Sequence, residues 1–256
     1  MNERDMLRPD ERVDDLQLAG LRIIQSPDAF RFSMDSVLLS DFARVSNHMK
    51  ICDLGTGTGI LPLLLHGRAE GLYCDAVEIQ PEAADRARRT MRLNHLEEKI
   101  IVHTADLREI RSLLPHAGYH LVICNPPYNA PEASLACSNK ALQAARQEAL
   151  CTLDDIAAAA AWLLRSRGRF VLMLPVARLA DAIDTLRRHR LEPKRLRFVH
   201  GKMERPARLA LIEAMLDVNP GLIIEPPLIA KNPDGSDTNE VRRIYHMTND
   251  TEEAGD

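Results

Sequence analysis

Cysteine is scarce in this chain of 256 residues, and long apolar runs are absent. No CxxC pair occurs, and the five cysteines are scattered at Cys52, Cys74, Cys124, Cys137 and Cys151. The first three lie in strand-like apolar runs, which predicts buried, reduced thiols rather than a zinc site. No run approaches the ~20 apolar residues that cross a bilayer, and residues 1–15 lack the core of a signal peptide. We therefore expect a cytoplasmic protein with no membrane partner and no bound metal.

The charge of the chain is unevenly distributed. Its formal net charge of −4 disfavours a nucleic-acid partner, but residues 162–214 hold thirteen Lys and Arg against five Asp and Glu. A basic segment in an acidic chain is typical of a nucleic-acid surface. Solvated helix faces with ion pairs would give the same composition, so both interpretations stay open.

Strand-like runs alternate with helical patterns along most of the chain, which predicts a sheet covered by helices on both faces. Seven strands are expected, at residues 50–54, 73–79, 100–103, 119–124, 169–174, 195–199 and 209–216. Helices are expected at residues 35–46, 60–66, 81–94, 154–165 and 176–190. The last two strands lack a helix between them, so the sheet should be mostly parallel and Rossmann-like, with the last strand antiparallel.

Three parts of the chain are distinguished by these patterns. We expect an N-terminal extension at residues 1–29, one α/β domain at 30–246 and a disordered acidic tail at 247–256. Residues 129–151 form a long excursion between a strand and a helix, and such excursions are usually functional or mobile.

A glycine-rich turn, "DLGTGTG", directly follows the first predicted strand. Gly55, Gly57 and Gly59 let the backbone bend tightly and approach a ligand closely. No Gly-Lys-Ser/Thr follows, so the turn is not a phosphate-binding P-loop. The spacing is GxGxG rather than GxGxxG, which disfavours an NAD-linked oxidoreductase.

Carboxylates follow three successive predicted strands, at the sheet edge where α/β proteins bind ligands. Asp53 would repel a pyrophosphate but attract an ammonium group, Glu78 could accept both hydroxyls of a ribose, and Asp106 could accept from an adenine amine. These groups together match S-adenosyl-L-methionine. The adjoining residues counted with this cofactor site are Thr56, Ile79 and Leu107.

The sequence "NPPY" ends the fourth predicted strand. Asn125 can offer its side-chain oxygen and Pro126 its carbonyl to the two hydrogens of an amine, while Pro127 makes the turn rigid. Tyr128 can stack on a flipped-out base. Two acceptors so placed would aim the amine lone pair at a methyl donor and stabilise the positive charge that develops. The alternative is a turn that only ends the strand, with the tyrosine packed nearby.

From about residue 30 to 216 the chain resembles the class I S-adenosyl-L-methionine-dependent methyltransferases. "DLGTGTG" is similar to the first motif of that family and "NPPY" to its fourth. The NPPY form implies methylation of an amine: adenine N6, an exocyclic amine of guanine or the glutamine amide.

From about residue 11 to 245 the chain resembles the bacterial tRNA1(Val) adenine-37 N6-methyltransferases. The resemblance implies that Asp35 helps to frame the amino-acid end of the cofactor and that Asn125 belongs to both sites; a helix N-cap is the alternative for Asp35. It also implies that a basic surface around residues 187–208 holds the anticodon arm of tRNA. Gln147 departs from the histidine expected between Arg146 and Glu148, which could equally be an exposed helical pair.

Two other functions are compatible with the same motifs. A release-factor N5-glutamine methyltransferase would share NPPY, but that family carries a larger helical domain before the glycine loop. A non-catalytic nucleotide-binding module would not need NPPY.

Overall fold

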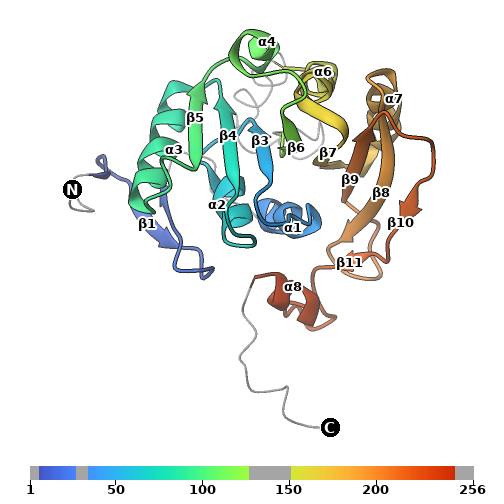
Figure 1. Ribbon diagram of the computed structural model, residues 1–256. Coiled ribbons are helices and arrows are strands. Elements are labelled where there is room, and N and C mark those ends of the chain that lie inside the picture. Colours follow the sequence, from blue (N-terminus) through green and yellow to red (C-terminus); the bar gives the residue numbers. More distant parts are fainter. Residues whose placement is uncertain (1–5, 27–33, 127–150, 246–256) are drawn as a thin grey trace, which may run out of the picture.

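The computed structural model describes residues 6–26, 34–126 and 151–245, and its centre is a nine-stranded sheet (Figure 1). The strand order is β10-β8-β9-β7-β6-β3-β4-β5, with β11 also paired to β8. The strands are β3 (Lys50–Leu54), β4 (Tyr73–Glu78), β5 (Ile100–Thr104), β6 (Tyr119–Cys124), β7 (Leu164–Pro175), β8 (Leu191–His200), β9 (Leu209–Leu216), β10 (Ile223–Ile224) and β11 (Leu228–Ile229).

The expected seven-stranded, mostly parallel sheet is confirmed by β3 to β9. Strand β9 is antiparallel to both β7 and β8, and the remaining pairs of this described sheet are parallel. Two short strands were not expected: β10 and β11 extend the sheet beyond β8. Strand β8 also begins earlier than expected, because a register shift after Pro193 lets the proline lie within the strand.

Helices cover both faces of the sheet (Figure 1). The helices are α1 (Met34–Phe42), α2 (Ile60–His66), α3 (Pro81–Leu93), α4 (Ile110–Leu113), α6 (Leu153–Leu163), α7 (Leu179–Arg188) and α8 (Asn239–Ile244), with short 3₁₀ turns η2 (Leu107–Glu109) and η3 (Val176–Arg178). One core cluster joins the sheet to α1, α2 and α3, and a second joins it to α6 and α7. Successive strand residues alternate between them: Ile51 belongs to the first cluster and Cys52 to the second.

The N-terminal segment folds as a hairpin of β1 (Arg12–Asp15) and β2 (Arg22–Gln25), in which Arg12 pairs with Gln25. It is attached to α3, since the Ile24 amide donates to the Thr90 hydroxyl at 3.2 Å. The buried Glu11 carboxylate accepts from Arg86 at 3.0 Å and from Arg89 Nη2 at 2.9 Å. The sequence patterns did not indicate this hairpin.

Three further expectations concern the cysteines, the excursion at 129–151 and the C-terminal tail. Cys52, Cys74 and Cys124 are buried and free, as expected. The excursion at 129–151, apart from its last residue, and the tail at 247–256 lie outside the described residues. Within the described ranges, no helix has the length and apolar character needed to cross a membrane.

Candidate active site

Parallel pairing brings the candidate residues to one edge of the sheet. Leu54, the last residue of β3, pairs with Val77 of β4 and with Cys124 of β6, and Glu78 pairs with Thr104 of β5. The segments that leave this edge carry the glycine loop, Asp106 and Asn125. The backbone therefore brings these segments to one edge of the sheet, and ligand binding at that edge stays a prediction.

The glycine loop is held by β4. The Gly55 and Thr56 amides both donate to the Val77 carbonyl, at 2.9 and 3.0 Å. Gly55 and Gly57 have φ values of +75° and +57°, a left-handed conformation that other residues adopt at a cost. At Gly59 (φ +84°) an added Cβ would lie 2.5 Å from the methyl carbon of Met91, so α3 packs directly on the loop.

Glu78 fixes the loop from the next strand. One carboxylate oxygen accepts from the Gly57 amide at 2.8 Å and the other from the Gln80 amide at 2.8 Å. Each oxygen keeps a lone pair for a ligand hydroxyl. Ile79, next along the chain, is 41% exposed and offers an apolar surface beside these groups. The support of the glycine loop by Glu78 was not recognised from the sequence.

Asp53 is the least satisfied group of the site. Its side chain is fully buried, and neither carboxylate oxygen has a hydrogen-bond donor among the described residues. Burial raises the pKa of Asp53 to about 7; the nearby Thr56 hydroxyl lowers it and the Glu78 carboxylate raises it further. The Thr56 hydroxyl oxygen is itself buried, with no hydrogen-bond partner in the part of the chain that the structure describes. Unsatisfied buried groups each cost about 1–3 kcal/mol, so this pair fits a site completed by a ligand.

Asn125 presents a free acceptor. Its amide nitrogen lies 3.4 Å from the Ser36 hydroxyl on α1, while its side-chain oxygen is buried with no donor in the described structure. Asp53 pairs with Ile123, so strand geometry places Asn125 roughly 8 Å from Asp53. Ser36 was missed by sequence analysis, because no local pattern links it to a residue 89 positions away.

The remaining predicted residues occupy varied positions. Asp106 is the N-cap of η2 and forms an ion pair with Arg108. Hydrogen bonds from the Arg108 side chain lower the pKa of Asp106. An adenine amine bound here would share the carboxylate oxygens with Arg108. Leu107 begins η2. Asp35 lies within the first turn of α1 rather than before it, where the helix dipole favours a carboxylate. Pro126 is the last described residue of its segment, and Pro127 and Tyr128 lie outside the described residues.

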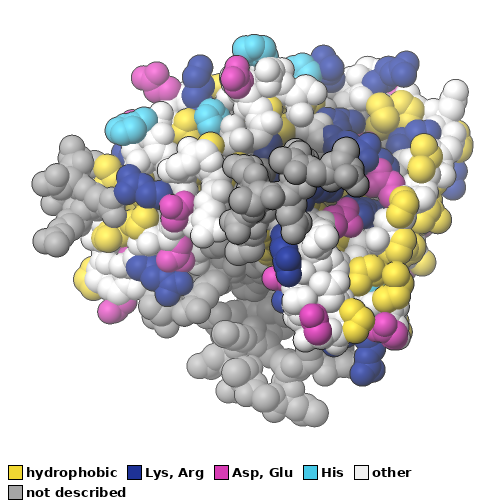
Figure 2. All heavy atoms as spheres, turned by 90° about the horizontal axis from the view of Figure 1, so that it is seen from below, with side chains coloured by type: hydrophobic (Ala, Val, Ile, Leu, Met, Phe, Trp, Pro, Cys, Tyr) yellow, Lys and Arg dark blue, Asp and Glu magenta, His cyan; other side chains and the backbone are white. Residues whose placement is uncertain are grey.

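The basic surface expected around residues 187–208 is not uniform. Five of its arginines, from α7 to the middle of β8, form ion pairs: Arg187 with Glu192, Arg188 with Asp154, Arg190 with Asp217, Arg195 with Glu213 and Arg197 with Glu240. On the face shown in Figure 2, basic and acidic side chains are interspersed. The interpretation as ion-paired faces therefore applies to residues 187–197.

Comparison with known proteins places this site in a family. The model of the methyltransferase small domain matches residues 32–177. A tRNA1(Val) (adenine(37)-N6)-methyltransferase of Yersinia pseudotuberculosis is 32% identical over 148 residues, which are 57% of this chain and 58% of that protein. A predicted O-methyltransferase from Agrobacterium tumefaciens has a similar fold, with a TM-score of 0.68 and 22% identity over 83% of this chain and 95% of that one.

The chain belongs to the methyltransferase small domain family. The matched region spans 58% of the length of the curated relative, less than two thirds of it. The family match therefore identifies the domain, and the reaction of this chain and its acceptor are proposed below from the site.

Proposed function

We propose that this protein transfers the methyl group of S-adenosyl-L-methionine to the N6 amine of an adenine in tRNA, namely adenine 37 of tRNA1(Val). The observation that carries the proposal is the Asn125 side-chain oxygen just after β6, which is buried and has no hydrogen-bond partner among the described residues. The relatives named for this reaction, at 32% identity, support the choice of acceptor.

The proposed cofactor site uses the groups that the fold leaves incomplete. Asp53 and Thr56 would receive the cationic amino-acid end, with Asp35 framing it from α1. The remaining lone pairs of Glu78 would accept the ribose hydroxyls, and Ile79 and Leu107 would flank the adenine, whose amine would share Asp106. Gly55, Gly57 and Gly59 would keep the backbone free of side chains at this contact.

The chemistry on the acceptor side follows from two fixed oxygens. Asn125 Oδ1 and the Pro126 carbonyl would each accept one N–H of the target amine, so that its lone pair points toward the donor methyl. Bound S-adenosyl-L-methionine would supply this methyl group, with a neutral thioether as the leaving group. As the N–C bond forms the nitrogen becomes positive, and the same two oxygens then stabilise it.

No strong base is required for this reaction, because the methylated nitrogen becomes acidic and loses its proton to solvent. Pro127 would hold the turn rigid and Tyr128 would stack on the extruded base. Ser36 would act as a positioning residue, because it engages the Asn125 amide nitrogen and leaves the oxygen for the substrate.

The test is a direct assay of the acceptor. The protein is incubated with cofactor and unmodified tRNA1(Val), or with the same transcript carrying guanine at position 37, and digested RNA is examined by mass spectrometry. We expect N6-methyladenosine from the first transcript alone. A release factor is assayed in parallel. Methylglutamine without methyladenosine would replace the proposed acceptor, and cofactor binding without any product would indicate a binding module.

A further inference from the structure

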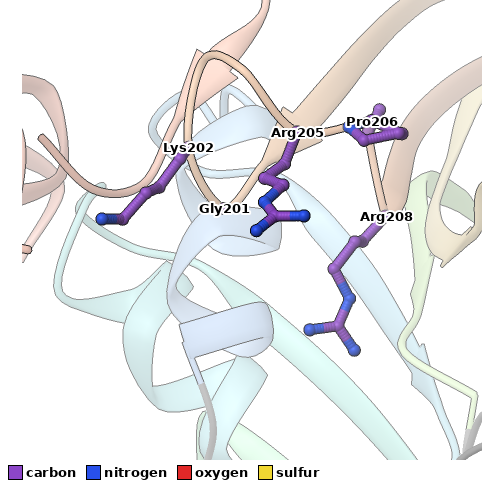
Figure 3. A pocket seen from close by; sticks show the side chains of 6 residues that line it. Gly201, Lys202, Arg205, Pro206 and Arg208 are labelled. Atoms are coloured by element: carbon purple, nitrogen blue, oxygen red, sulfur yellow. The ribbon is translucent and has the colours of Figure 1, made fainter. Parts of the chain in front are cut away.

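The turn between β8 and β9 borders an open hollow of about 560 Å³ with basic residues around it. Its lining residues are Gly201, Lys202, Arg205, Pro206, Ala207 and Arg208, so three of six are basic and none is acidic. Figure 3 shows the three long basic side chains extending from this turn. Arg205 and Arg208 are exposed, and Lys202 is half-buried.

Arg205 and Arg208 differ from the ion-paired arginines at residues 187–197 because no carboxylate pairs with them in the described structure. Lys202 has a carboxylate nearby: hydrogen bonds from Ser236 and the charges of Arg242 and Lys202 lower the pKa of Asp234. Within the described ranges, Arg205 and Arg208 have neither an ion pair nor a side-chain hydrogen bond, and Lys202 donates only to the Pro233 carbonyl, at 3.1 Å. Glu204 lies in the same turn but does not line the hollow. Two uncompensated guanidinium groups at one hollow, with an ammonium group beside them, repel each other, and an anion would relieve that repulsion.

The hollow lies on the same sheet edge as the proposed acceptor site. Leu209, at the start of β9, pairs with Pro175 at the end of β7, and the Val176 amide donates to the Arg208 carbonyl at 3.0 Å. Strand β7 is parallel to β6, and Leu172 pairs with Cys124, the residue before Asn125. Two strand spacings, about 10 Å, therefore separate the strand leading to Asn125 from the start of β9.

The chemistry of the hollow favours phosphate. Each guanidinium group can hold a phosphate through two parallel N–H donors, and an ammonium group adds a point charge. Leu209 also lies three residues further along the strands than Cys124, so the full separation is roughly 14 Å, which corresponds to only a few nucleotides along a strand. Met203, 66% exposed in the same turn, could contact a neighbouring base.

We propose that Lys202, Arg205 and Arg208 bind the phosphodiester backbone of the RNA substrate close to the methylated nucleotide. The proposal rests on the proposed function, since it assumes a nucleic-acid acceptor. It assigns RNA binding to the β8–β9 turn rather than to the ion-paired arginines at residues 187–197, and it makes the turn a determinant of RNA affinity rather than of methyl transfer.

The test compares two double variants with equal loss of charge. Arg205→Gln/Arg208→Gln removes the guanidinium pair. Arg165→Gln/Arg167→Gln is the matched control, because these exposed arginines lie in the irregular stretch of β7 between the paired residues Leu164 and Arg169, at the opposite sheet edge, and have no ion pair within the described ranges. Thermal unfolding and cofactor affinity should be unchanged in both. For each protein, RNA affinity is measured over a range of salt concentrations. The KM and kcat for tRNA are measured at a single salt concentration.

We expect the turn variant to bind unmodified tRNA at least tenfold more weakly at low salt. The slope of log K against log salt should fall by about 1.4–1.8, the loss of two phosphate contacts. KM should rise while kcat at saturating tRNA stays within about twofold. The control should match the unchanged protein, and a turn variant that also matches it overturns the proposal.

Two further outcomes separate this proposal from the proposed function. If the unchanged protein methylates tRNA but the two double variants behave alike, only the hollow loses its role. If the unchanged protein neither binds nor methylates tRNA and modifies a release factor instead, both proposals fail. A turn variant weakened only toward that protein would then show that the hollow takes acidic side chains.

Discussion

At the scale of single residues, the site is marked by polar groups whose hydrogen-bonding capacity the fold leaves unused. Asn125 Oδ1, Thr56 Oγ1 and both Asp53 oxygens are buried without donors in the described structure. Such groups are rare in folded proteins because each is costly. Their gathering at the carboxyl ends of β3 and β6 indicates a ligand contact rather than several separate defects.

Asn125→Ala should separate binding from chemistry. We expect unchanged cofactor affinity and a fall in kcat of roughly 100-fold or more, the usual cost of removing one acceptor or donor that acts in the transition state. Isothermal titration with the cofactor and single-turnover methylation give the two quantities. Ser36→Ala should lower kcat less, since it only loosens the amide. Asn219→Ala, at an exposed loop position, is the matched control. Unchanged turnover in Asn125→Ala would remove this residue from the mechanism.

At the scale of elements, the N-terminal hairpin is attached to α3 by a buried charge cluster. Glu11 is 3% exposed and lies between Arg86 and Arg89, which are 13% and 10% exposed. Although burial raises the pKa of Glu11, hydrogen bonds from Arg89, the Arg8 amide and Arg86 bring it to about 2. This stabilisation is complete above the unfolded pKa near 4.5 and is lost as the pH falls toward 2.

Glu11→Gln should therefore destabilise the protein by about 3 kcal/mol at pH 7, because two guanidinium groups lose their carboxylate. Urea unfolding at pH 7 measures the difference, which should shrink when the pH is lowered from 5 to 3. Glu97→Gln, an exposed position without an ion pair in the described structure, is the control and should change stability by less than about 0.5 kcal/mol. Equal stability of the two variants would show that the hairpin is not held by Glu11.

Elements with a strong local pattern were predictable, and elements stabilised from a distance were not. The strands at 50–54, 119–124 and 209–216 match β3, β6 and β9, because buried runs bounded by turns specify them locally. The β1–β2 hairpin depends on Thr90 and Asn94, about seventy residues away. Strands β10 and β11 have two residues each and no period to detect.

The same distinction applies to the site. The glycines and the acids after each strand could be located from sequence, because topology sends all strand ends to one edge. The hydrogen bonds that these side chains already make within the fold could not be predicted. Gly57–Glu78 and Ser36–Asn125 are contacts between segments that are distant in the sequence. The neutralisation of residues 187–197 likewise depends on partners such as Asp154 and Glu240, which lie elsewhere in the chain.

At the scale of the whole molecule, Asp53 links global stability to the cofactor. Its pKa is about 7 in the folded protein against an unperturbed 3.8, so the folded state binds more protons between these values. The free energy of unfolding should therefore decrease as the pH rises from about 4 to 7, by at most roughly 4 kcal/mol from this group. A cationic ligand beside Asp53 would favour the ionised carboxylate and release its proton.

The rise in Tm caused by saturating S-adenosyl-L-methionine should consequently be larger at pH 7.5 than at pH 5.5. Below pH 7 the cofactor must displace a proton, which weakens binding by up to tenfold per pH unit and lowers the mass-action stabilisation. The α-amino group of a peptide titrates near 7.7–8.0, and an amine with at least that pKa is mostly cationic over this pH range. Asp53→Asn is the control, because it cannot ionise: it should remove this pH dependence, bind the cofactor weakly and make the unliganded protein more stable than the parent at pH 7.5. Scanning calorimetry with and without cofactor gives every quantity. An equal Tm rise for the parent protein at both pH values would show that Asp53 does not meet the charge of the cofactor.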